Sequence, residues 1–127
     1  MSAISLLGFV GAANTVMASH APAPTSVTCG IAGTDVNVDW DDMSINGTPI
    51  THYGIEFITT YGDEVREFDF SVNNVSEFST PLTTFDIDTD NDGTPDTNPD
   101  TLEVTVKSLN PGKHRQNNAK AGPVSCA

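Results

Sequence analysis

The chain has 127 residues and a mass of 13.4 kDa, the size of a single domain, which excludes a multidomain enzyme or a large α/β barrel. Its 17 acidic residues face five lysines and arginines, for a net charge of −12. This charge repels the phosphates of nucleic acids and of anionic membranes and attracts cations. We therefore expect no nucleic-acid partner.

Residues 1–20 resemble a secretory signal peptide. The stretch from Ile4 to Ala18 is apolar and rich in small residues, and it is too short for a membrane-spanning helix, which needs about 20 apolar residues. Val16 and Ala18 suit the positions before a cleavage site. No basic residue precedes Arg66, however, so a retained segment used in assembly stays open as an alternative. The pattern predicts a secreted or cell-surface protein without a transmembrane span.

Residues 21–24 read APAP and predict a stiff, extended linker, because each proline fixes its own φ and disfavours helix at the residue before it. We place the start of the folded domain after this linker, so that it covers residues 25–127.

Short segments of alternating apolar and polar residues, separated by turn signals such as Asn46-Gly47, follow along the domain. No segment after residue 25 has a convincing helical period. The pattern therefore predicts an all-β fold, a seven-stranded antiparallel β-sandwich. The expected strands are 26–29, 36–40, 50–60, 65–72, 82–87, 102–109 and 119–126. The expected core between the sheets contains Trp40, Tyr53, Ile55, Phe57, Val104 and Val106.

Three motifs in this order resemble a fibronectin type III domain. They are VNVDW ending at Trp40, NGTPITHY over residues 46–53, and LEVTVKSLN over residues 102–110. Leu102 stands where the family has a tyrosine, and the short link before that strand is replaced by a longer segment. The resemblance implies a two-sheet, immunoglobulin-like sandwich that binds or spaces and does not catalyse.

The replacing segment, residues 86–100, reads DIDTDNDGTPDTNPD and carries six aspartates. Its D-x-D-x-D-G register brings carboxylates together on one hard cation, and the glycine permits the sharp turn. The spacing predicts a Ca²⁺ site, and the loop resembles the calcium loops of thrombospondin type 3 repeats. The alternative is a solvated acidic turn. The expected ligands are the side chains of Asp88, Asp90, Asp92 and Asp96, the carbonyl of Thr94, and Asp100, which lies one residue beyond the closing position.

The two cysteines, Cys29 and Cys126, predict one disulfide if the protein is exported. Two unrelated thiols in a reducing compartment are the alternative. In a fibronectin-type sandwich we expect the first and last strands to end near the same pole, which would bring these cysteines within bonding distance.

Two readings of function follow. The first is a non-enzymatic, exported calcium-binding module that contacts a protein or glycan at a surface. The second is a structural subunit of an extracellular filament, in which residues 1–20 are retained and copies of the chain assemble by strand exchange. Two Asn-x-Ser/Thr sequons, beginning at Asn46 and Asn74, have meaning only if the source is eukaryotic.

Overall fold

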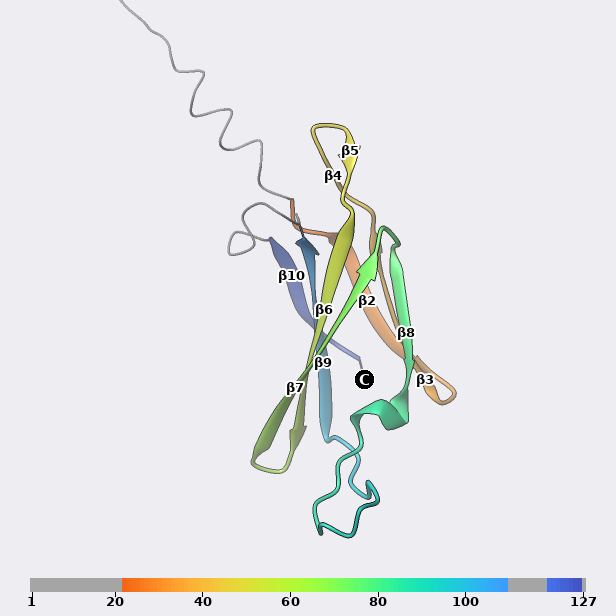
Figure 1. The fold of residues 1–127 in the computed structure, drawn as a ribbon, viewed down its shortest axis with the longest axis vertical. Helices are drawn as coiled ribbons and strands as arrows, with labels where there is room; N and C mark the ends of the chain where they lie inside the picture. Colours follow the sequence, from red (N-terminus) through yellow and green to blue (C-terminus); the bar gives the residue numbers. More distant parts are fainter. Residues whose placement is uncertain (1–21, 110–118, 127) are drawn as a thin grey trace, which may run out of the picture.

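A computed structural model describes residues 22–109 and 119–126, which form a sandwich of two antiparallel sheets (Figure 1). The four-stranded sheet has the order β10-β9-β6-β7 and the three-stranded sheet the order β2-β3-β8, while β4 and β5 form a small separate hairpin. The predicted all-β antiparallel sandwich is therefore confirmed. The strands are β2 (Thr25–Ala32), β3 (Asp35–Asp41), β4 (Ser44–Ile45), β5 (Thr48–Pro49), β6 (His52–Tyr61), β7 (Glu64–Asn73), β8 (Glu77–Pro81), β9 (Thr101–Leu109) and β10 (Lys120–Ser125).

The core lies where the alternating strands turn their apolar faces toward each other. β3 buries Val36, Val38 and Trp40 while its acidic residues face water, as the period of two requires. Across the sandwich, the rings of Trp40 and Tyr53 pack with their centroids 5.3 Å apart. All six residues of the predicted core are buried, namely Trp40, Tyr53, Ile55, Phe57, Val104 and Val106.

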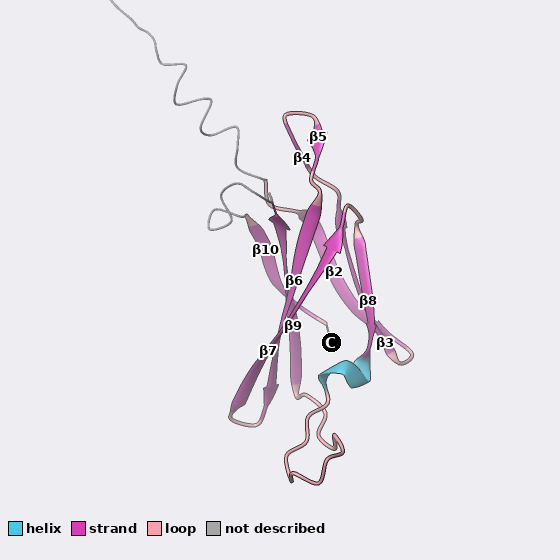
Figure 2. Ribbon diagram, viewed as in Figure 1, coloured by secondary structure: helices cyan, strands magenta, loops and turns pink. Residues whose placement is uncertain are grey.

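One predicted strand is wrong. Residues 82–87 do not form a strand: Leu82–Phe85 is a 3₁₀ turn, shown in cyan in Figure 2, and the edge strand of the smaller sheet is β8, just before it. Among the described strands β8 pairs only with β3, and it is half exposed, so it lacks the apolar alternation that reveals a buried strand. Phe85 at the end of the 3₁₀ turn is fully buried, which explains the apolar character of the segment.

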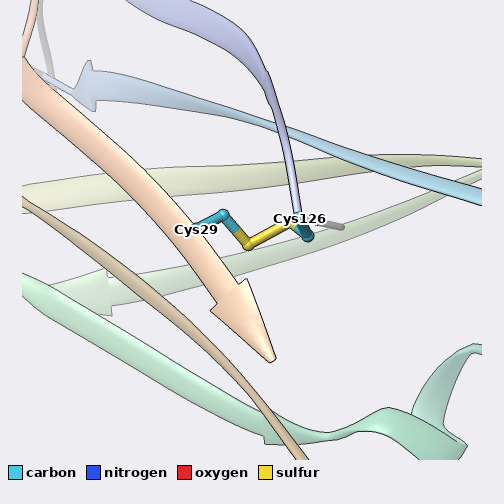
Figure 3. The surroundings of a disulfide bond; sticks show 2 residues. All are labelled: Cys29 and Cys126. Atoms are coloured by element: carbon cyan, nitrogen blue, oxygen red, sulfur yellow. A yellow bond between two sulfur atoms is a disulfide. The ribbon is translucent and has the colours of Figure 1, made fainter. Parts of the chain in front are cut away.

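A disulfide between Cys29 of β2 and Cys126, just after β10, closes one side of the sandwich (Figure 3). The two Cα atoms are 4.7 Å apart, and 97 positions separate the cysteines in the sequence. In the chain-entropy account, closing a loop of this length stabilises the fold by about 4–5 kcal/mol.

The two ends of the sandwich carry different connections. The β7–β8 turn lies beside the end of β3, since Asp39 pairs with Glu77, and the β4–β5 hairpin begins just beyond it. At the start of β3, Asp35 pairs with Pro81, and the chain passes through the 3₁₀ turn into the acidic loop, residues 86–100. Figure 1 shows the hairpin and the acidic loop at opposite poles.

Candidate metal centre

The acidic loop is held at its base by the end of β6. On the entry side, the Tyr61 hydroxyl donates a hydrogen bond to the Phe85 carbonyl. On the exit side, the Asp100 backbone N–H donates to the Thr60 carbonyl at 2.7 Å, and the Asp100 carboxylate accepts from the Gly62 backbone N–H at 2.6 Å. Thr60, Tyr61 and Gly62, three consecutive residues at the β6–β7 hairpin, therefore hold both ends of the acidic loop.

Within the loop, Ile87 and Thr97 form an antiparallel bridge with N–H to carbonyl distances of 3.0 Å in both directions. The bridge makes residues 88–96 a closed subloop. At its tip, Asn91 and Gly93 have φ of 61° and 88°. This left-handed conformation suits glycine and, next best, asparagine, and it permits the tight winding of the subloop.

The winding brings four carboxylates together. One oxygen each from Asp88, Asp90, Asp92 and Asp96 lies within 4.8 Å of the others. Oxygens that bind one Ca²⁺ at about 2.3–2.6 Å lie at most roughly 4.6–5.2 Å apart, so a single ion could contact all four. The four carboxylates therefore form a group that could hold a metal ion.

Backbone N–H groups orient all four carboxylates, that of Asp96 through a long hydrogen bond of 3.4 Å from the Thr89 N–H. Gly93 donates to Asp88 Oδ2 and Thr94 donates to Asp92 Oδ1, both at 2.8 Å, and the Asp92 N–H donates to Asp90 Oδ1 at 3.2 Å. Asp88 Oδ1, by contrast, is a buried oxygen that has no hydrogen-bond partner among the residues that the structure describes. A buried carboxylate oxygen that lacks a donor is costly unless a cation or a proton reaches it, and its neighbours here are other carboxylates.

The crowding of the carboxylates perturbs their protonation. The carboxyls of Asp88 and, next, Asp96 raise the pKa of Asp90, because its neutral form shares a proton with them. Partial burial of Asp88 favours its neutral form, but the hydrogen bond from the Gly93 N–H and further donors outweigh it, so the pKa of Asp88 is lowered. The Thr97 hydroxyl leads the donors that lower the pKa of Asp96.

The remaining two predicted ligands lie differently. Asp100 is outside the cluster, and its carboxylate is used to hold the β6–β7 hairpin. Thr94 is exposed at the rim of the subloop, and its N–H orients Asp92. The structure therefore brings together four of the six predicted residues and gives Asp100 a structural contact.

A second acidic group, absent from the sequence-based prediction, lies on the outer face of the larger sheet. Glu56, Glu67 and Asp69 offer oxygens within 4.8 Å of one another, because Glu56 pairs with Asp69 across β6 and β7. Contact with Asp69 and, next, Glu56 raises the pKa of Glu67. Lys107 Nζ lies 3.9 Å from Glu56, so a lysine already offsets part of this charge. Only the cross-strand register could have revealed this group.

An apolar hollow of about 220 Å³ lies beside the acidic loop. The residues that line it include Ile31 of β2, Leu102 of β9 and Pro99 of the acidic loop. Pockets for small molecules usually measure about 300–1,000 Å³, so this hollow is small.

The fold resembles that of a protein domain of known structure. The crystal structure of the FN5 domain of Drosophila Lar matches with a TM-score of 0.51 over 83% of this chain and 92% of that chain. The fold is fibronectin type III-like. At 17% sequence identity this likeness concerns the fold alone. No protein-family model and no curated protein matches the sequence.

Residues 1–20, interpreted above as a signal or assembly segment, lie outside the described residues. Within the described ranges, the structure contains no helix with the length and apolar character needed to cross a bilayer.

Proposed function

We propose that this chain is an exported, non-enzymatic binding module whose acidic loop binds Ca²⁺. The observation that carries the proposal is the convergence of four carboxylates, one of which has a buried oxygen without a hydrogen-bond donor. Asp88, Asp90, Asp92 and Asp96 would hold the ion, and the Thr94 carbonyl would complete the set from the rim. Water would fill the position that Asp100 does not reach.

The role of the ion would be structural. Four carboxylates in one subloop repel one another, and a divalent cation removes that repulsion and links the two limbs of the loop. Because both limbs are tied to the end of β6, an ordered loop also stiffens this pole of the sandwich. We infer that the stiffened pole presents a fixed surface to a protein or glycan outside the cell.

Export is supported by the disulfide, because such bonds persist in oxidising compartments and are rare in the cytosol. The signal-like segment points in the same direction. The absence of catalysis is proposed by analogy with the fold alone, because sandwiches that resemble fibronectin type III domains generally bind or space.

Thermal unfolding in chelator and in about 5 mM Ca²⁺ tests the proposal. Extracellular sites bind with Kd of about 10⁻⁴–10⁻³ M, so this concentration should stabilise the domain by about 1–2 kcal/mol. The melting temperature should then rise by at least about 4 °C. Mg²⁺ should act more weakly, because it demands a tighter octahedron and loses water reluctantly. Identical melting curves in chelator and calcium would refute the site.

Matched variants separate calcium binding from general charge effects. Asp90→Asn and Asp92→Asn should abolish most of the calcium response, and in chelator they should melt no lower than the parent, because repulsion is relieved. Asp39→Asn removes the same charge from the exposed face of β3 and should keep the full response. Loss of the response in Asp39→Asn would show that calcium acts through overall charge.

A further inference from the structure

Two sequons lie at the pole opposite the acidic loop. Asn46-Gly47-Thr48 spans the turn of the β4–β5 hairpin, and Asn74-Val75-Ser76 forms the turn between β7 and β8. The Trp40 N–H at the end of β3 donates to the Ser76 carbonyl at 3.0 Å, which places the second turn beside the strand that leads into the hairpin. Figure 1 shows both turns away from the acidic loop.

Both asparagines are exposed at the tips of tight connections. Asn46 and Gly47 have φ of 52° and 83°, the left-handed pair typical of a two-residue hairpin turn. Val75, the middle residue of the other sequon, is 42% exposed although it is apolar. A bulky, hydrophilic group attached at either position would project into solvent without displacing the core.

We propose that Asn46 and Asn74 are attachment sites for asparagine-linked oligosaccharides. This inference rests on the proposed function in one respect, since the modification requires export, and it applies to a eukaryotic source, as stated for these sequons above. The donor is a lipid-linked oligosaccharide, and an oligosaccharyltransferase is the catalyst. The asparagine Nδ2 forms a bond to C1 of the first sugar, the bond from C1 to the lipid phosphate oxygen breaks, the lipid phosphate leaves, and the amide proton passes to a base of the transferase.

The placement separates modification from the candidate metal centre. Asn91 and Asn98 lie in the acidic loop, but Gly93 and Asp100 stand two positions after them, so neither can be an acceptor. No other asparagine in the sequence has Ser or Thr two positions later. The attached oligosaccharides would therefore shield the hairpin pole and leave the loop pole uncovered.

The test is peptide mapping of the full-length protein purified from its native source, treated with an amidase that releases asparagine-linked glycans in heavy-oxygen water. Conversion of Asn46 and Asn74 to labelled aspartate is the expected result. Unmodified asparagine at both positions would overturn the proposal, and an unmodified residue at one position would remove that site. The calcium melt on the same sample reports on the proposed function independently.

Variants keep the proposal falsifiable at each position. The chain is translated with an added standard signal peptide in the presence of microsomes. The imported chain should then show two stepwise decreases in gel mobility, one for each oligosaccharide, and an endoglycosidase should reverse both steps. Asn46→Gln and Asn74→Gln should each lose one step, and the double variant both. Asn73→Gln, next to the second acceptor but outside any sequon, should keep both steps. An imported, protease-protected chain without these steps, or steps that persist in the double variant, would count against the sites.

Discussion

Phe85 joins the hydrophobic core to the acidic loop, so its truncation should affect both stability and calcium response. The side chain is fully buried, with ring centroids 4.7 Å from Phe57 and 5.1 Å from Phe68. Its carbonyl accepts the Tyr61 hydroxyl hydrogen bond at the entry of the loop. Phe85→Ala removes the ring and leaves a cavity, which should cost about 3–5 kcal/mol, a large part of the 5–15 kcal/mol typical of a domain.

Urea unfolding of parent and variant, each with and without calcium, measures the effect. The variant midpoint should fall without a large change in the slope, and half-maximal stabilisation should need more calcium, because the ion must also order the loosened entry of the loop. Phe78→Ala is the matched control, since Phe78 belongs to the same aromatic cluster but is half exposed on the edge strand. A cost for Phe85→Ala below about 1 kcal/mol, or no greater than that of Phe78→Ala, would refute the argument.

Four further outcomes are expected. Asp100→Ala should lower stability by about 1 kcal/mol, because the hydrogen bond from the Gly62 N–H of the β6–β7 hairpin is lost. The variant should keep its calcium response, and loss of that response in a calcium titration would make Asp100 a ligand. Trp40→Ala should cost roughly 3–5 kcal/mol in denaturant unfolding, and a water-exposed emission spectrum of the parent tryptophan would contradict its burial. Gly122→Ala should destabilise by at least about 2 kcal/mol, because φ is 118° and the added Cβ would lie 2.7 Å from the Val104 backbone oxygen. Gly30→Ala is the control, since its Cβ would meet no atom of the described residues within 4 Å, and equal melting temperatures of the two variants would contradict the argument. Burial raises the pKa of Tyr53 above its usual 10, so the folded state holds this proton more tightly than the unfolded state does. The free energy of unfolding should therefore fall above about pH 10. Tyr53→Phe should flatten that fall, and an unchanged dependence of stability on alkaline pH would exclude Tyr53 as its source.

The sandwich could be predicted from sequence where strands are buried on one face. In β3, β6 and β9 the apolar side chains recur with period two, and the side of the core follows directly. β8 has one aromatic residue among polar neighbours and packs at an edge, so its strand conformation depends on pairing with β3, which no local pattern encodes.

The acidic loop likewise has one part that could be predicted from sequence and one part that could not. The juxtaposition of Asp88, Asp90, Asp92 and Asp96 depends on spacing within one short turn, which the sequence displays. The place of Asp100 depends on the Gly62 N–H, 38 positions away, and could not be read from the loop. The position of Asp100 is set by a contact between segments far apart in the sequence, which the spacing within the loop does not reveal.

The disulfide also determines how the domain would carry a mechanical load. Tension applied through the residues before Cys29 and after Cys126 passes across the sulfur–sulfur bond and bypasses the chain between them, a sequence separation of 97. That stretch of chain could add roughly 320–350 Å of contour length if it were pulled straight. In the oxidised protein that length is locked, so the domain acts as a nearly inextensible link even when its sheets have come apart. Reduction would convert the same domain into an extensible one.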